Sequence, residues 1–410
     1  MKKEMNAIAL MLLLVAGNAL AAGFEKNTFW SGQYAGFGDA AVSVVSGSQS
    51  LYFNPAGMAG QTGWEVSGNF SPTFSSFTGA LAGNPVTSNT GFSPIYGVTA
   101  SYGVTSDFAI GVGSYISGGT KADYDPVNIG APNNAALNAD LSLNEFVVGA
   151  AYQVVPGFKI GAAWRGVLAN ATFNQPGGVQ NPSPPPAVLP IDTSFSGLSQ
   201  FVASGFKIGA EWASADKVWN VGANFRSNVD LDNLSGTVTT TNLLTGSQIA
   251  LGGNTASLST SFPAQYSLGV AYAISSTVKG ILQYDFTNYQ KVSSIGVTTG
   301  GTVQAPIATN WNNLNNGRIG FEFTGVPDWT LRMGYVYTSE VVPADNASPI
   351  FSAPGAANTF TLGAGTELCT NFHADAAFEF SKASGSGSAI DPGSFSDQAY
   401  ALHLGGTYRF

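Results

Sequence analysis

Ionisable side chains that could bind a ligand or act in catalysis fall on only one of the two alternating sets of positions in several segments of this 410-residue chain. In FKIGAAWRG, which begins at Phe158, Lys159 and Arg165 alternate with Ile160 and Trp164. Basic groups in this pattern can hold a ligand carboxylate or pair with acidic groups. Seven basic residues share this parity: Lys159, Arg165, Lys207, Arg226, Lys279, Arg318 and Arg332. Three acidic residues that can neutralise some of them share it too: Glu211, Asp285 and Glu322.

The two histidines of the chain, His373 and His403, are the residues to consider for catalysis or metal binding. By parity they share a face with Asp375, Glu379 and Arg409, and antiparallel pairing of the last two segments brings His403 diagonally close to Asp375 or Glu379. A lipid-cleaving Ser-His arrangement would have to face lipid, on the opposite side. We therefore expect an ion-pair network, no enzyme activity, no metal and no cofactor.

The elements that carry these residues are about 14 strand-length segments with alternating polarity. Short connections, such as Thr105-Ser106-Asp107, alternate with long loops rich in Gly, Pro, Ser and Asn, such as the one from Asn174. This arrangement is typical of bacterial outer-membrane barrels. The sequence predicts an all-β, 14-stranded antiparallel transmembrane barrel in the outer membrane of a Gram-negative cell.

The parity of the charges indicates which face of the barrel meets lipid. A Lys or Arg at the bilayer midplane costs about 2 to 4 kcal/mol, so several of them cannot face lipid together. Only 10% of residues are charged, 44% are hydrophobic and 12% are aromatic. We expect the charged face to line the lumen and the aromatic face to contact outer-membrane lipid.

Other global features exclude some classes of protein. The net charge of −9 argues against nucleic-acid binding. The single cysteine, Cys369, cannot form an intramolecular disulfide. Both a secreted β-sandwich and a fibrous adhesin domain are alternatives with similar composition, but neither needs an even strand count together with one-sided charge.

The two ends of the chain carry export and assembly signals. Residues 1–21 have two early lysines, a short apolar run and an Ala-x-Ala end, as a secretory signal peptide does. The last segment, QAYALHLGGTYRF, ends on Phe410. That terminal aromatic resembles the signal by which the barrel-assembly machinery recognises its clients.

The segment between the signal peptide and the barrel, residues 22–62, is too long for a simple lead-in. A barrel of 14 strands leaves a lumen wider than its own side chains can fill. We therefore expect an N-terminal hatch, or plug, over residues 22–62 and the barrel over residues 63–410. Within the hatch, Asn54, Pro55 and Gly57 predict a tight turn.

Several stretches resemble the FadL/TodX family of outer-membrane transporters of hydrophobic compounds: GFGDAAVSVVSGSQSLYFNPAGMAG, FPAQYSLGVAY, and NWNNLNNGRIGFEF followed by PDWTLRMGYVYTSEVVPADN. The resemblance covers nearly the whole mature chain. It implies a hatch inside the barrel, in which Asn54, Pro55 and Ala56 match the family triplet and, with Gly57, form the gating turn. It also implies a substrate that leaves sideways where the third strand kinks.

The third strand is expected from Phe108 to Gly119, and the family's usual break is absent from it. Glycine within a strand often marks a bulge, although it can also make room for neighbouring aromatic residues. The candidates for the kink and lateral exit are Gly111, Gly113, Tyr115, Gly118 and Gly119.

The resemblance implies passive uptake of long-chain fatty acids or aromatic hydrocarbons, and the sequence leaves the choice between them open. The candidate ligand-pocket residues are Phe24, Phe29, Lys159, Arg165, Arg318 and Arg332. The expected partners are the hydrophobic substrate, outer-membrane lipid and the barrel-assembly machinery, and we expect a monomer. The alternatives are a general porin and a structural or adhesin-like barrel.

Overall fold

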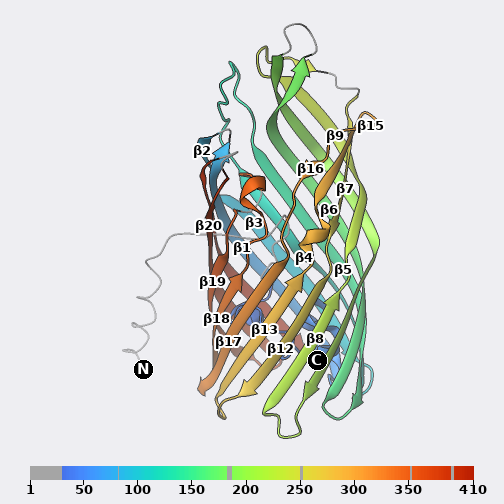
Figure 1. The fold of residues 1–410 in the computed structure, drawn as a ribbon. Coiled ribbons are helices and arrows are strands. Elements are labelled where there is room, and N and C mark those ends of the chain that lie inside the picture. The colour runs from blue at the N-terminus through green and yellow to red at the C-terminus, as the bar shows by residue number, and fades with distance from the viewer. Residues whose placement is uncertain (1–29, 82, 182–186, 250–252, 351–352, 389–391) are drawn as a thin grey trace.

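The computed structural model describes residues 30–81, 83–181, 187–249, 253–350, 353–388 and 392–410, which form a closed antiparallel β-barrel (Figure 1). The predicted 14-stranded fold is confirmed. Three wall strands are each divided into two segments. In chain order the wall consists of β1 (Gly63–Leu81), β3 (Gly91–Gly103), β4 (Phe108–Asp123), β5 (Asn138–Val155), β6 (Phe158–Asn181), β7 (Ala187–Ala213), β8 (Trp219–Arg226) with β9 (Val229–Asn242), β11 (Thr255–Phe262) with β12 (Gln265–Ala273), β13 (Val278–Thr287) with β14 (Ser294–Thr299), β17 (Leu314–Val326), β18 (Trp329–Thr338), β19 (Ala357–Cys369), β20 (Phe372–Ser386) and β21 (Ser394–Arg409).

The first and last wall strands close the barrel. β1 pairs antiparallel with β21 from Glu65 opposite Arg409 to Thr78 opposite Ser396. Because the barrel is closed, the backbone N–H and C=O groups at the edges of both strands are hydrogen-bonded, as a lipid environment requires. Short strands extend the sheet at the end with the long loops (Figure 1): β2 (Asn84–Thr87), β10 (Gln248–Ile249), β15 (Thr302–Val303) and β16 (Ile307–Ala308).

The two faces of the wall differ as the alternation predicted. On β7, Phe206 and Ile208 are 43% and 52% exposed, whereas Lys207 between them is 2% exposed. Arg165, Arg318 and Arg332 are also buried. The prediction that charges point into the lumen is therefore confirmed for these strands, and the apolar face is left for lipid.

The N-terminal segment fills part of the lumen, as expected for a hatch (Figure 1). From residue 30 onward, where the structure describes it, the segment contains the short helices α2 (Gly32–Ala35), η1 (Gly47–Gln49), α3 (Ser50–Phe53) and η2 (Pro55–Met58). Trp30, Tyr34, Phe37 and Leu51 are buried within it. Two further helical turns lie in the long connections, η3 (Tyr289–Lys291) and η4 (Ala344–Asn346). Within the described part of the chain, no helix has the length and apolarity that a membrane crossing requires.

Candidate functional site

A break in the sheet separates the outer parts of β3 and β4. These strands pair only from Gly97 opposite Tyr115 to Gly103 opposite Ala109. Beyond that point β3 pairs only with β1 and β4 pairs only with β5, and a bulge at Ser117 shifts the register between β4 and β5. The strands are joined again at the far end, where Asn89 N donates to Asp123 O over 2.7 Å. We call the gap between residues 92–96 and 116–120 the window.

The residues predicted for a kink in the third strand divide into two groups. Tyr115 is the last residue of β4 that pairs with β3, and Gly118 and Gly119 follow the bulge and line the window. Gly111 and Gly113 lie in the regular part of the ladder, where they face Leu51 of the hatch. The structure therefore brings three of the five candidates to the break, and the remaining two lie beneath the hatch. Their part in an exit stays a prediction.

A cavity of about 280 Å³ passes through the window. On the lumen side it is lined by Ser75 and Glu379, which are buried. On the other side it is lined by Phe92 and Tyr96, which are 45% and 54% exposed on the lipid face. Residues from both faces of the wall thus line one cavity.

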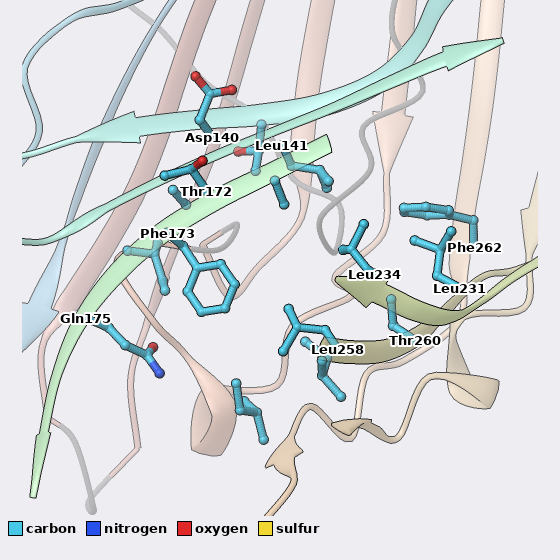
Figure 2. Close-up of a pocket in the computed structure, with 16 residues that line it drawn as sticks. Asp140, Leu141, Thr172, Phe173, Gln175, Leu231, Leu234, Leu258, Thr260 and Phe262 are labelled. Carbon is cyan, nitrogen blue, oxygen red and sulfur yellow. The ribbon is translucent and has the colours of Figure 1, made fainter. Parts of the chain in front are cut away.

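A second, apolar cavity lies in the half of the barrel near the long loops, and we call it the apolar pocket (Figure 2). It encloses about 70 Å³, and most of its lining is apolar: Ala139, Leu141, Ala171, Phe173, Leu231, Leu234, Leu258, Phe262, Ile295, Ile307 and Ile350. Thr120, Asp140 and Leu141 line both this pocket and the window cavity. The two cavities therefore adjoin.

The apolar pocket was missed by the sequence analysis, although its parity carries a signal. In VDLDNL, from Val229 to Leu234, the leucines point inward and the aspartates outward. This is the reverse of the pattern in β7, where Lys207 points inward. Exposed aspartates are compatible with water but not with lipid, so the reversal marks wall above the membrane with an apolar interior.

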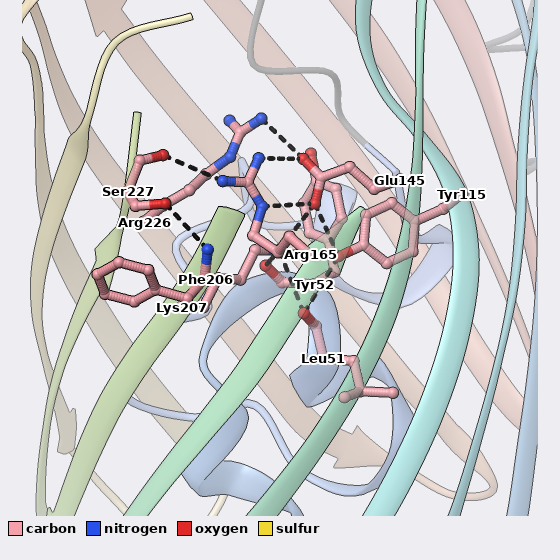
Figure 3. Close-up of polar contacts among 9 residues, drawn as sticks. All are labelled: Leu51, Tyr52, Tyr115, Glu145, Arg165, Phe206, Lys207, Arg226 and Ser227. Atoms are coloured by element: carbon pink, nitrogen blue, oxygen red, sulfur yellow. Dashed lines mark hydrogen bonds and ion pairs between the residues drawn. The ribbon is translucent and has the colours of Figure 1, made fainter. Parts of the chain in front are cut away.

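A buried cluster of charges lies on the window side of the lumen (Figure 3). Glu145 on β5 accepts from Arg165 Nε and Nη2 over 2.9 and 2.6 Å and from Arg226 Nη2 over 2.8 Å. Lys207 Nζ lies 3.6 Å from the same carboxylate. We call Glu145, Arg165, Lys207 and Arg226 the ion cluster. It holds three cations around one anion, and charge-assisted bonds of this kind fix geometry strongly.

The hatch turn at Asn54 is attached to the wall by its side chain. Asn54 Nδ2 donates to Val42 O and Ala210 O over 2.7 and 3.1 Å, and Asn54 Oδ1 accepts from Ala56 N over 3.2 Å. Pro55 supplies the first residue of η2, where its missing N–H costs nothing. Gly57 follows within η2 and is buried. All four predicted turn residues thus lie together at the junction of hatch and β7, and gating by them stays a prediction.

A second set of ion pairs lies on the opposite wall. Arg318 pairs with Asp285, and Arg332 contacts Glu322 and Asp375 over 3.1 and 2.7 Å. His403 Nε2 lies 3.2 Å from Glu379 and its Nδ1 lies 2.8 Å from Ser71 Oγ, so the predicted histidine contact is confirmed. Among the described residues, no group of three or more His, Cys, Asp or Glu side chains could hold a metal ion.

The predicted ligand-pocket residues do not meet in one place. Phe24 and Phe29 lie outside the described residues. Lys159 lies 4.0 Å from Glu211 near the hatch turn, whereas Arg165 belongs to the ion cluster and Arg318 and Arg332 to the opposite wall. None of these four lines the apolar pocket. Contact between any of them and a ligand stays a prediction.

Comparison with solved structures shows the same fold in several transporters. A Pseudomonas aeruginosa FadL homologue has a TM-score of 0.79 at 16% identity, with 95% of this chain and 100% of that chain covered. The Ralstonia pickettii toluene transporter TbuX has a TM-score of 0.73 at 16% identity, with 94% of this chain and 99% of that chain covered. The Pseudomonas putida toluene transporter TodX has a TM-score of 0.71 at 15% identity, with 92% of this chain and 97% of that chain covered.

Sequence comparison assigns the family. No curated protein sequence matches this chain. A family model described as outer membrane protein transport protein (OMPP1/FadL/TodX) matches residues 12–399, which is most of the chain. This family consists of transport channels, not of enzymes. The chain therefore belongs to the OMPP1/FadL/TodX family of Gram-negative outer-membrane transport proteins.

Proposed function

We propose that this protein is a passive outer-membrane channel for hydrophobic compounds, which it takes up at the apolar pocket and releases sideways through the window. The observation that carries this proposal is the adjoining of the two cavities at Thr120, Asp140 and Leu141. On this proposal a molecule in the apolar pocket moves past these shared residues into the window and reaches lipid without passing the hatch.

The physical reason for a lateral route lies in the solubility of the substrate. Each methylene removed from water contributes about 0.8 kcal/mol, so release from an apolar pocket into water is opposed by several kcal/mol for any sizeable hydrocarbon. Release into the bilayer retains most of that energy. Diffusion down a gradient then needs no energy source.

The lining of the apolar pocket favours a neutral substrate, and we propose monoaromatic hydrocarbons ahead of long-chain fatty acids. The one charged residue among the described lining residues is Asp140, and it pairs with Lys121 over 3.4 Å, so the lining offers no basic group to hold a fatty-acid carboxylate. The basic groups nearest the hatch are paired with acids in the ion cluster and on the opposite wall. Structural neighbours include two toluene transporters, which agrees with this choice.

The proposal is tested by uptake of radiolabelled toluene and oleate into cells that carry the gene or an empty vector. We expect toluene uptake to rise with the gene and oleate uptake to rise less. Leu258→Asp, which places a charge in the apolar pocket, should abolish the gain, whereas Leu282→Ala on the lipid face of β13 should retain it. Equal uptake in cells with and without the gene would refute the function.

The lateral step needs its own variant. Deleting Ser117 removes the bulge, so β4 can continue its regular course beside β3 and narrow the window. We expect toluene uptake to fall while the barrel keeps its heat-modifiable mobility in gels. Unchanged uptake in a folded deletion variant would contradict exit through the window.

A general porin is the competing function. It would pass small ions, whereas a barrel filled by its hatch should conduct very little. Single-channel recording in planar bilayers separates the two, because open-porin conductance in the wild-type protein would favour the porin.

A further inference from the structure

Three aromatic rings meet at the foot of the window, where pairing of β3 with β4 resumes. Trp30 and Tyr52 of the hatch stack with ring centroids 5.2 Å apart and planes 14° apart. Tyr115 of β4 packs against both of them, with centroid distances of 5.4 and 5.1 Å. Trp30 and Tyr115 are 0% and 1% exposed. The hatch thus contacts the end of the ladder through side chains.

The position opposite Tyr115 on β3 is Gly97, and the indole of Trp30 occupies the space beside it. A Cβ atom on Gly97 would overlap Nε1 and Cε2 of Trp30 and Cβ of Tyr115. The indole therefore lies directly against the β3 backbone at the lower edge of the window. Ile95, which lines the window cavity, packs against the same aromatic group.

Lys207 contacts both the aromatic rings and the hatch backbone (Figure 3). Its Nζ donates to Leu51 O and Tyr52 O at the end of α3 over 3.2 and 3.0 Å, and to the hydroxyl of Tyr115 over 2.8 Å. The ammonium group also lies 5.4 and 5.2 Å from the ring centres of Tyr52 and Tyr115. One buried cation therefore contacts both the hatch and the strand that borders the window.

We propose that Trp30, Tyr52, Tyr115 and Lys207, which we call the gate cluster, couple the hatch to the window. While Lys207 holds the end of α3 against Tyr115, the rings close the foot of the window. A substrate, or a movement of the hatch, can displace Trp30 from Gly97. The window then opens toward the lumen at the end where β3 and β4 begin to pair. These four are positioning residues, and the inference rests on the proposed lateral exit.

The structure offers a matched pair of glycines to test this coupling. Gly97→Ala introduces a Cβ that displaces Trp30 on the window side and also presses on Cβ of Tyr115, so it disturbs two members of the gate cluster. Gly320→Ala on β17 introduces a Cβ that would lie 2.8 Å from Phe37 Cβ, so it pushes a different hatch aromatic on the opposite wall. Both changes crowd the hatch by one methyl group, but only the first touches the gate cluster.

The readout is the accessibility of the window, which does not depend on transport. Ile95→Cys in a Cys369→Ser background is labelled in lipid vesicles with pyrene maleimide, which partitions into the bilayer. We expect Gly97→Ala to speed labelling about tenfold, because two ring contacts that each shift an equilibrium several-fold are lost. With Gly320→Ala, Ile95→Cys should be labelled at the same rate as without either glycine substitution. Equal rates for the two glycine variants would overturn the coupling.

Three further variants guard against a simple loss of folding. Trp30→Ala removes bulk instead of adding it, and it should speed labelling as Gly97→Ala does. Lys207→Met should also speed labelling, and Lys207→Arg should restore part of the slow rate because it keeps the charge. If Trp30→Ala and Lys207→Met leave both labelling and heat-modifiable mobility unchanged, the gate cluster does not couple hatch and window.

Toluene uptake by the same variants separates this inference from the proposed function. If the wild-type protein takes up no toluene, the proposed function fails whatever the labelling rates are. If the wild-type protein transports toluene but all variants label and transport alike, only the coupling fails. Faster labelling together with altered uptake in the window-side variants alone supports both.

Discussion

The hatch meets two walls of the barrel in different ways. On the side of β17 to β19 the ladders run without a break beside the hatch, with a register shift only beyond Phe323 near the turn. Arg318 Nη1 donates to Gly38 O over 2.8 Å and Thr361 Oγ1 donates to Gly36 O over 3.2 Å. On the side of β3 and β4 the ladder ends at Tyr115, where stacked aromatic rings pack against the hatch in addition to the hydrogen bond from the Tyr115 hydroxyl to Leu51 O. The first wall can hold the hatch while the second one releases it.

The largest difference between the walls is expected at their buried acids. Glu145 faces three cations, whereas Asp285 pairs with Arg318. Glu145→Gln leaves the cations of the ion cluster without their anion, and breaking a buried ion pair costs about 3 to 5 kcal/mol. The free energy of unfolding, measured by urea titration of the refolded barrel in lipid vesicles, should fall more for Glu145→Gln than for Asp285→Asn. If both variants lose the same free energy of unfolding, the two walls do not differ in the contribution of their buried acids.

The next effect concerns the hatch turn. Asn54→Ala removes the donors to Val42 O and Ala210 O and the cap on Ala56 N. Leaving buried carbonyl groups unsatisfied costs about 1 to 3 kcal/mol, which loosens the hatch without breaking the wall. Conductance in planar bilayers should rise, and the double variant with Pro55→Ala should lose normal toluene uptake. Normal transport by a folded double variant would remove the turn from the mechanism.

A smaller effect is expected on the regular wall. Thr361→Val removes one hydrogen bond to Gly36 O and keeps the shape of the side chain. A single bond of this kind contributes about 0.5 to 1.5 kcal/mol, so conductance should rise less than in Asn54→Ala. Labelling of Ile95→Cys at the window should stay at the starting rate. A rise as large as that for Gly97→Ala would show that the walls are not independent.

The smallest effect is a dependence of hatch order on alkaline pH. Tyr34 of the hatch is buried, and this burial raises the pKa of its hydroxyl, which accepts from Ser46 N over 3.2 Å. Because the folded value lies above the unfolded value of about 10, the ordered hatch is favoured at lower pH and loses stability as the pH rises above about 10. Conductance of the wild-type channel should therefore rise in that range. The conductance of the Tyr34→Phe variant should rise less steeply with pH. If the variant and the wild-type protein have the same pH profile, Tyr34 does not have this role.

The sequence predicted the wall well because lipid imposes a strict rule on it. Every second residue of a spanning strand must be apolar, so the positions of Lys207 and Arg318 already indicate which face is the lumen. The contact of His403 with Glu379 followed from the same parity. These predictions need only the period of a strand and the cost of a charge in lipid.

The site itself could be predicted only in part, because it depends on register. The glycines of the third strand pointed to a break, but whether the ladder ends at Gly111 or at Tyr115 is decided by pairing across β3, β4 and β5. The apolar pocket needed the reversed parity near Leu231 to be interpreted as wall above the membrane. The contacts of Lys207 with Leu51 and Tyr52 join residues more than 150 positions apart, and no local pattern indicates them.

The hydrogen bonds between Trp64 and Phe410 have a consequence for biogenesis. Trp64 N donates to Phe410 O over 2.8 Å and Phe410 N donates to Trp64 O over 3.0 Å, so the seam joins the first wall residues to the last residue. The ring cannot be completed until β21 and Phe410 have been synthesised and exported. The hatch precedes the wall in the chain, so it is available to be enclosed as the seam forms.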